Sequence, residues 1–193
     1  GIEDEKLFEY AKEELTKLSQ GSEPFNFTVL TVDTHNPNGY VCRLCGDEFE
    51  NQYSNVLRCG SRQAVEFVSW IKEQPWYENT TVVIAGDHAT MVKNYAPDDD
   101  SYERGVYYCF LNPAAVLADR THSACTMDLF PTTLAAMGVE IEGDRLGLGT
   151  NLFSDRDTIL DEFGKEEVIS QLNMKSDFYD NELLYGEPAE ETD

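Results

Sequence analysis

Three short apolar segments rich in β-branched and aromatic residues constrain the fold of this chain more than any other feature. Residues 25–33 (FNFTVLTVD) and 80–85 (TTVVIA) are nearly continuous in apolar character, as is typical of buried parallel strands. The third segment spans residues 105–111 (GVYYCFL). Helical patterns alternate with these segments, at residues 3–19, 61–73 and 127–137. The alternation predicts an α/β fold with a mostly parallel sheet flanked by helices. Three strands are few for such a sheet, so we expect part of the domain to lie outside this chain.

The charge of the chain excludes several classes of partner. It has 37 acidic and 14 basic residues, which gives a formal net charge of −23. Binding to nucleic acid requires clustered Lys and Arg, and unaided docking on an anionic bilayer has the same requirement. We therefore expect no nucleic-acid partner, and we interpret most of the carboxylates as a solvated surface. No run of about 18 apolar residues is present that could span a bilayer.

The five cysteines leave several alternatives open. They are Cys42, Cys45, Cys59, Cys109 and Cys125. The first two form a Cys-x-x-Cys pair, but neither the second pair of a zinc site nor the helix start of a redox motif follows it. A disulfide from Cys42 or Cys45 to Cys59 would close a short loop within the irregular stretch 35–60, and it would favour a location outside the cytoplasm. Free thiols and a metal site are the alternatives.

Polar residues follow two of the predicted strands where each strand ends. His35 comes just after residues 25–33, and Asp87 and His88 follow residues 80–85. In an α/β sheet, ligands bind beyond the carboxyl ends of the strands, so these three side chains are expected on one rim. A carboxylate beside an imidazole suits Zn, Mn or Fe. The alternative for the pair is an Asp that caps a helix and a His that packs on the sheet.

The remaining polar candidates are His35, which is ambiguous, and His122 and an acidic triplet, which favour structural roles. His35 could contact a phosphate or sulfate, or protonate a leaving group, but it could also be an ordinary loop residue. We expect His122 to have a surface or packing role, and the acidic triplet 98–100 to lie in a solvated loop, since no EF-hand spacing follows it. No Gly-x-Ser-x-Gly elbow, P-loop or dinucleotide fingerprint occurs in the sequence.

Three strings of the sequence, taken in order, resemble one family. They are TVDTHNPNGYVC (31–42), SRQAVEFVSWIKEQPWYENTTVVIAGDHATM (61–91) and MDLFPTTLAAMGVEIEGDRLGLGTNLFS (127–154). Together they resemble the sulfatase-type domain of membrane-anchored phosphoglycerol transferases and lipoteichoic acid synthases, in the alkaline phosphatase superfamily. The resemblance implies that residues 1–154 form the C-terminal part of a sulfatase-like catalytic domain, and we expect residues 155–193 to form an acidic helix and tail.

The resemblance also implies roles for individual residues. A divalent ion, usually Mn²⁺ with Zn²⁺ or Mg²⁺ as alternatives, would be held by Asp87 and His88 together with an acidic residue and a nucleophilic Thr. His35 would contact the phosphoglycerol head group. Cys45 and Cys59 would form a disulfide, while Cys42 has no clear counterpart in the family.

The implied reaction is a transfer through a covalent intermediate. The Thr attacks a phosphatidylglycerol-type lipid donor, and a glycan or a glycerol-phosphate polymer then accepts the phosphoglycerol. Thr16 and Thr28 are poor candidates, because they fall in a helical and a strand pattern. The nucleophile is therefore expected in the missing N-terminal half of the domain, so that the catalytic Thr is absent here and this chain alone binds metal weakly and is inactive.

The resemblance places the whole protein outside the cytoplasm, anchored in the cell membrane, with this chain as a soluble part. Two other functions compete with the transferase. One is a sulfatase or phosphatase of the same superfamily, which would share the Asp-His pair. The other is a non-catalytic, acidic extracellular binding module.

Overall fold

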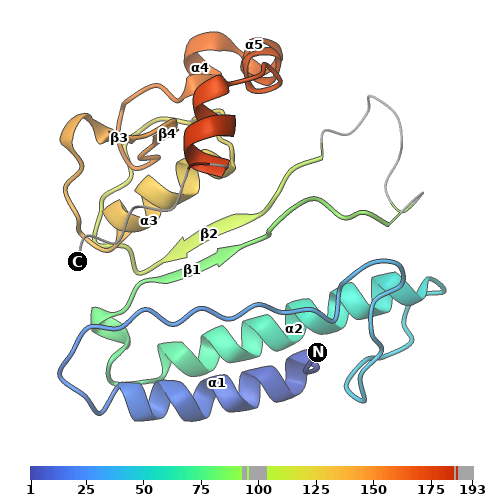
Figure 1. Cartoon of the computed structure of the whole chain (residues 1–193). Coiled ribbons are helices and arrows are strands. Elements are labelled where there is room, and N and C mark those ends of the chain that lie inside the picture. The colour runs from blue at the N-terminus through green and yellow to red at the C-terminus, as the bar shows by residue number, and fades with distance from the viewer. Residues whose placement is uncertain (93–94, 96–103, 185, 187–193) are drawn as a thin grey trace, which may run out of the picture. The chain divides into compact units, whose positions relative to one another are not determined.

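The computed structural model describes residues 1–92, 95, 104–184 and 186, which form two compact units (Figure 1). The first unit comprises residues 1–112 and the second residues 113–193. The acidic triplet 98–100 and the last residues of the predicted tail, 187–193, lie outside the described residues. The expected division of the chain after residue 154, into a catalytic part and an acidic tail, stays a prediction. Within the described residues, no helix combines the length and apolar character needed to cross a membrane.

The first unit is built on two packed helices, α1 (Asp4–Leu18) and α2 (Gln52–Lys72). The helix predicted over residues 3–19 is confirmed, and it buries Phe8, Ala11 and Leu15 as the periodicity required. The Phe8 ring lies 4.8 Å from the ring of Phe67 on α2. Apolar side chains at helical spacing therefore account for this contact.

The second helix begins earlier than the sequence pattern predicted. Residues 52–60 were expected to belong to a long loop, yet they form the first turns of α2. Asn51 caps the helix, because its side chain accepts hydrogen bonds from the backbone N–H groups of Tyr53 and Ser54. In α2, Val56 and Cys59 are buried in the core. Val65, which the apolar spacing within residues 61–73 predicts to point inward, is 65% exposed.

The predicted parallel sheet is not present among the described residues. The segments at 80–85 and 105–111 do form strands, β1 (Val82–Ala85) and β2 (Tyr108–Leu111). They pair antiparallel, with Val82 opposite Leu111 and Ala85 opposite Tyr108. The second pair of strands, β3 (Arg145–Leu146) and β4 (Gly149–Thr150), is antiparallel as well. The predicted mixture of helices and strands is confirmed, but the prediction that the strands are mostly parallel is wrong for the described residues.

The segment 25–33 is extended but unpaired, which contradicts its prediction as a central strand. In Figure 1 it is drawn as a plain trace that runs in the same direction as β1. The backbone N–H groups of Val32 and Asp33 donate to the Asp4 carboxylate, at 2.7 and 3.2 Å, instead of to a neighbouring strand. Leu30 is 71% exposed. The apolar pattern is that of a buried strand, but no described strand pairs with it.

The second unit contains α3 (Leu129–Ala136), the β3–β4 hairpin and a helical C-terminal part. The turn between β3 and β4 is held against the start of α3 by Asp128, which is fully buried. One carboxylate oxygen of Asp128 accepts from the Thr150 N–H at 2.8 Å, and the other accepts from the Cys125 N–H at 2.8 Å. A Cβ on Gly149 would lie 2.0 Å from the Met127 carbonyl oxygen, so only glycine fits there. The second glycine of the sequence LGLG (146–149) thus has a structural explanation in this unit.

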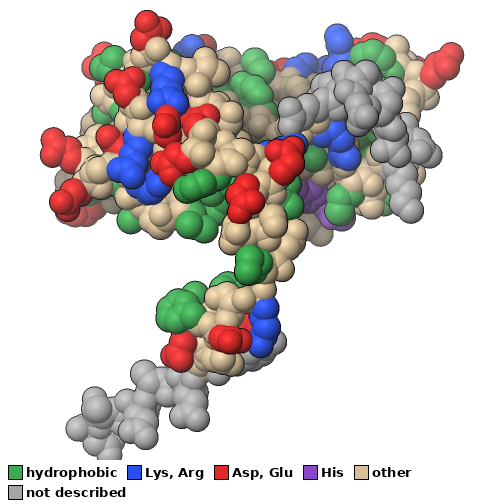
Figure 2. All heavy atoms as spheres, turned by 90° about the horizontal axis from the view of Figure 1, so that it is seen from above, with side chains coloured by type: hydrophobic (Ala, Val, Ile, Leu, Met, Phe, Trp, Pro, Cys, Tyr) green, Lys and Arg blue, Asp and Glu red, His purple; other side chains and the backbone are tan. Residues whose placement is uncertain are grey.

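The remaining elements are short. The predicted helix after residue 155 is confirmed as α4 (Ile159–Phe163) and α5 (Lys165–Leu172). The 3₁₀ turns and a final π-helical turn are η1 (Tyr77–Asn79), η2 (Thr126–Asp128), η3 (Glu142–Asp144) and η4 (Tyr179–Leu184). Figure 2 shows acidic side chains (red) spread over the visible face, with Lys and Arg (blue) among them. This distribution agrees with a solvated surface.

Candidate functional site

The end of β1 positions the predicted Asp-His pair. Gly86 extends the pairing with the opposite strand by one residue, because its N–H donates to the Tyr107 carbonyl at 2.9 Å. A Cβ at Gly86 would lie 2.9 Å from Val106 Cγ1, so the close approach of the two chains here favours glycine. The chain then leaves the ladder at Asp87 and His88, which places both side chains in a turn just beyond the strand.

The side chains of Asp87 and His88 lie against each other and are accessible. His88 Nε2 is 3.3 Å from Asp87 Oδ2, and the two side chains are 55% and 70% exposed. His88 Nδ1 lies 2.9 Å from the Ala89 carbonyl oxygen. A proton on Nδ1 satisfies that carbonyl and leaves a lone pair on Nε2, the nitrogen next to the carboxylate. Histidine side chains (purple) reach the surface on the face shown in Figure 2.

This arrangement fits two ligands of a divalent ion. Two atoms that are each about 2.1 Å from one ion, at tetrahedral or octahedral angles, are separated by about 3.0 to 3.4 Å. The separation of 3.3 Å between Nε2 and Oδ2 falls in that interval. Within the described part of the chain, no third carboxylate, imidazole or thiol joins the pair. The geometry of Asp87 and His88 is thus compatible with two ligands of one ion, and their metal role stays a prediction.

His35 lies in a tight turn that follows the extended segment 25–33. Its N–H donates to the Val32 carbonyl at 3.0 Å, and its carbonyl accepts from the Gly39 N–H at 3.0 Å. Gly39 has φ +68°, and a Cβ there would lie 2.7 Å from Val56 Cγ1, so glycine is required to seat this turn on α2. The imidazole is exposed, and its Nδ1 lies 2.8 Å from the Asn36 carbonyl oxygen. Its Nε2 is therefore the nitrogen available to a ligand.

Tyr53 connects the loop of His35 with the loop of Asp87 and His88. Its hydroxyl donates to the Thr34 carbonyl at 3.0 Å and lies 2.9 Å from Thr90 Oγ1. Since the tyrosine proton is used on Thr34, the Thr90 hydroxyl is the donor in the second bond. Tyr53 is 5% exposed. In Figure 1 the loops that follow the extended segment and β1 lie at the same side of the first unit. The two predicted parts of the site are tied through one buried hydroxyl.

Two groups beside this connection were missed by the sequence reasoning. Tyr53 was assigned to a loop, although Asn51 followed by residues of helical spacing is a signal for its helix. The guanidinium of Arg104 donates to the Thr90 carbonyl, which brings a cation to the loop after His88. No local pattern distinguished Arg104, because its partner is distant in the sequence. The Tyr53 ring is held edge-on by Tyr95, with 4.9 Å between the ring centroids.

Asp33 is the buried acid closest in sequence to His35. It is 3% exposed, and its Oδ2 has no hydrogen-bond partner among the described residues. Burial and the neighbouring carboxylate of Asp4 raise the pKa of Asp33. Its backbone carbonyl accepts from the Tyr40 N–H at 2.7 Å, which closes the turn that carries His35.

The cysteines of the first unit gather at one place. All five cysteines are described, and each carries a free thiol. Cys42 Sγ lies 3.7 Å from the sulfur of Cys45 and 3.7 Å from that of Cys59. Burial and a hydrogen bond with the Cys59 thiol raise the pKa of Cys45 to about 12. The disulfide between Cys45 and Cys59 stays a prediction.

His122 lies in the second unit and has a packing role there, as expected. Its side chain is 4% exposed, with Nδ1 2.9 Å from Asp161 Oδ2 and Nε2 2.9 Å from the Ser154 carbonyl oxygen. A hollow of about 440 Å³ in the same unit is lined by residues such as Ala114, Ala135 and Ile141. None of the predicted site residues lines this hollow.

Comparison with known proteins identifies the family of the chain. Phosphoglycerol transferase I of Citrobacter koseri is 33% identical over 97 residues, which are 47% of this chain and 13% of that protein. The proteins of the same name from Escherichia fergusonii and Salmonella paratyphi B are each 32% identical, with the same coverage. The match thus spans only a small part of these relatives. No solved structure matches the chain.

The family described as Sulfatase matches residues 1–139. A sulfatase domain has an alkaline phosphatase-like α/β fold, so the predicted class holds at that level, although the parallel sheet is not seen in the described residues. The matched range includes the turn of His35, the Asp87–His88 pair and the connecting Tyr53. With the greater part of its length matched, the chain belongs to the sulfatase family.

Proposed function

We propose that this chain is part of a metal-dependent phosphoglycerol transferase that acts outside the cytoplasm and is anchored in the cell membrane. The observation that carries the proposal is the 3.3 Å separation of His88 Nε2 and Asp87 Oδ2, at the end of β1 and tied through Tyr53 to the turn of His35. The name phosphoglycerol transferase I of the similar proteins supports this activity over others of the family. The donor would be a phosphatidylglycerol-type lipid, and the acceptor a glycan or a glycerol-phosphate polymer.

Asp87 and His88 would hold the divalent ion, with Mn²⁺ as the first choice and Zn²⁺ or Mg²⁺ as alternatives. When bound, such an ion offsets the negative charge of the transferring phosphoryl group. The Nδ1 of His88 is occupied by the Ala89 carbonyl, which leaves Nε2 as the nitrogen that would bind the ion. The nucleophilic Thr, through which the covalent intermediate forms, would lie in the N-terminal half of the domain, outside this chain.

His35 would bind the phosphoglycerol head group through Nε2. The bond between its Nδ1 and the Asn36 carbonyl fixes the ring orientation, and with a second proton on Nε2 the imidazolium would donate to a phosphate or leaving-group oxygen. The buried network of Asp4 and Tyr53 holds the backbone of this turn, so that the imidazole is positioned before the substrate arrives. The guanidinium of Arg104 would add positive charge to a site on an otherwise acidic chain.

The proposal is tested in the full-length protein that contains this chain. Release of diacylglycerol from phosphatidylglycerol is measured for the wild type and for Asp87→Ala and His88→Ala. Loss of a ligand should lower kcat/KM by at least about 10³-fold, since charge stabilisation in the transition state is lost. Asp47→Ala, which removes an exposed carboxylate from the loop before α2, is the matched control. Full activity of both variants at the pair would contradict the proposal.

A sulfatase or phosphatase activity is the second candidate, because the family described as Sulfatase covers residues 1–139. Hydrolysis would use the same Asp-His pair, so substitutions alone do not separate the two functions. Aryl sulfates and aryl phosphates offered to the same full-length protein, in parallel with phosphatidylglycerol and a glycan acceptor, do separate them. Turnover of the aryl esters without glycerophosphate transfer would favour the hydrolase.

A further inference from the structure

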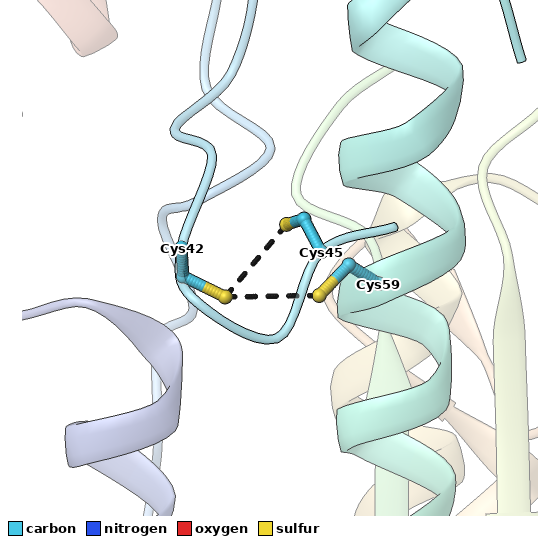
Figure 3. Close-up of side chains that lie close together, drawn as sticks. All are labelled: Cys42, Cys45 and Cys59. Carbon is cyan, nitrogen blue, oxygen red and sulfur yellow. Dashed lines mark hydrogen bonds between the residues drawn. The ribbon is translucent and has the colours of Figure 1, made fainter. Parts of the chain in front are cut away.

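The three cysteines of the first unit converge from two elements (Figure 3). Cys42 and Cys45 lie on the loop before α2, and Cys59 lies on the helix itself, with the three side chains turned toward one another. All three sulfur atoms lie within 4.8 Å of each other. Cys42 and Cys59 are only 4% and 2% exposed, whereas Cys45 is partly accessible. Three soft ligands thus enclose one point at the edge of the core.

The spacing of the sulfur atoms is that of ligands around one ion. Thiolates bound tetrahedrally at about 2.3 Å from zinc are separated from one another by about 3.8 Å. The two separations that involve Cys42 are both 3.7 Å. A disulfide brings two sulfurs to about 2.05 Å and leaves the third without a bond, so it would use only part of this cluster.

Donor groups surround the sulfurs as they would surround bound thiolates. The side chain of Gln63 is 4% exposed, and its Nε2 lies 3.5 Å from Cys59 Sγ and 3.8 Å from Cys42 Sγ. The guanidinium of Arg62 is 3.7 Å from Cys59 Sγ. N–H groups of this kind offset the negative charge that three thiolates place on a metal centre. A buried amide aimed at two sulfurs is a second observation, independent of the cysteine spacing.

The loop is fixed in the shape that the cluster needs. The N–H of Cys45 donates to the Cys42 carbonyl at 3.1 Å, so that the Cys-x-x-Cys segment forms a tight turn with both thiols on one side. Arg43, within that turn, forms an ion pair with Glu5 of α1. Arg62 also donates to the Leu44 carbonyl. The ligands are therefore held in place before an ion binds, which lowers the cost of ordering them.

We propose that Cys42, Cys45 and Cys59 form a second metal site, which binds one thiophilic ion of the Zn²⁺ class through three thiolates. Among the described residues no carboxylate or imidazole completes the set, so the fourth position is open to water or an external ligand. The site is separate from the Asp87–His88 pair and does not depend on the proposed function. The Cys45–Cys59 disulfide implied by the family resemblance would be the oxidised form of the same sulfurs and excludes the ion.

The test uses the 193-residue chain, purified with a phosphine reductant under nitrogen. Zn²⁺ is titrated in competition with a chromophoric chelator, and bound zinc is counted by mass spectrometry after dialysis. We expect one equivalent of zinc in the wild type. Co²⁺ in place of Zn²⁺ should give a sulfur-to-cobalt charge-transfer band. Cys109→Ser, which changes a cysteine of β2 outside the cluster, is the control and should behave as the wild type.

Cys42→Ser should weaken zinc binding by at least about 100-fold and abolish the cobalt band. Because Cys42 is buried, the partly exposed Cys45 provides a second variant, Cys45→Ser, with the same expectation. Far-UV circular dichroism of the metal-free variants shows whether each is folded. Asp87→Ala combined with His88→Ala should leave the zinc equivalent in place. Less than 0.1 equivalent of zinc in the reduced wild type, or unchanged affinity in a folded Cys42→Ser or Cys45→Ser chain, would overturn the proposal.

Discussion

The hydroxyl groups of Tyr53 and Thr90 lie 2.9 Å apart, although the two residues are 37 positions apart in the sequence. The same tyrosine oxygen donates to the Thr34 carbonyl at 3.0 Å. One side chain of α2 therefore fixes both the turn that carries His35 and the turn that follows His88. The relative placement of these histidines depends on a residue that carries no chemistry of its own.

Tyr53→Phe should lower stability and disturb the site together. The substitution leaves the part-buried Thr34 carbonyl without its donor, which costs about 1 to 3 kcal/mol of unfolding free energy. Urea unfolding followed by fluorescence checks this, since both Trp70 and Trp76 lie in the first unit. Tyr40→Phe is the matched control, because that side chain is 55% exposed. Equal unfolding free energies of the two variants would show that the Tyr53 hydroxyl does not stabilise these turns.

The isolated chain should bind Mn²⁺ weakly. Asp87 and His88 are the only two ligands that the described residues place together there, and both are largely exposed. Isothermal titration of the chain with Cys42→Ser in the background, which removes the thiol cluster from the measurement, should give a dissociation constant well above 10 μM, in line with a two-ligand site (about −7 kcal/mol or weaker). Micromolar or tighter affinity would mean that further ligands exist in this chain.

Gly149→Ala should destabilise the second unit far more than Gly147→Ala. The new methyl group at position 149 would meet the Met127 carbonyl oxygen at 2.0 Å, so the backbone must shift. Such a clash costs about 3 kcal/mol or more. At position 147 the space is open and only the φ of +60° is unfavourable, at about 1 to 2 kcal/mol. Thermal unfolding by circular dichroism compares the two, and a similar loss for both would contradict the packing described for the β3–β4 turn.

The Asp161 carboxylate should make the second unit sensitive to acid. Burial by itself would raise its pKa, but hydrogen bonds from His122 and from the N–H groups of Ser123 and Thr158 hold the pKa of Asp161 below its usual value. Because the pKa is lower in the folded chain, this stabilisation is complete above about pH 4 and is lost as the pH falls further.

Asp161→Asn should therefore be less stable than the wild type at pH 7, with a smaller difference at pH 3. Asp155→Asn, which changes an exposed acid of the same unit, serves as the control. Urea unfolding at several pH values, followed by circular dichroism, gives the dependence of the unfolding free energy on pH for the wild type and for each variant. If the unfolding free energies of the wild type and of Asp161→Asn fall equally between pH 7 and pH 3, the Asp161 carboxylate does not stabilise the fold in this way.

Local patterns predicted the elements whose stability is local. The apolar periodicity of α1 and the β-branched run of β1 both correspond to observed structure. A local pattern does not show which segment pairs with which, however. Residues 25–33 were therefore predicted to be a sheet strand, although no described strand pairs with them. The start of α2 was missed because the Cys-Gly sequence at 59–60 weakened the helical pattern, whereas Asn51 caps it eight residues earlier.

The site was predicted in part for the same reason. His35, Asp87 and His88 are marked by their positions directly after strand-like segments, and the structure places the latter two in contact. Tyr53 and Arg104 were not predicted, because their roles depend on bonds to Thr90 and Thr34 that span many residues. The convergence of Cys42 with both other cysteines likewise required knowledge of where α2 begins.

The unpaired extended segment has a consequence for handling this chain. Leu30 and Val32 are 71% and 41% exposed, and within the described part of the chain no strand pairs with the backbone of residues 25–31. Such an edge is a template onto which another extended backbone can add. Copies of the chain should accordingly self-associate as concentration rises, with Leu30→Lys suppressing it, so that dilute samples report the monomer and concentrated ones a β-augmented oligomer.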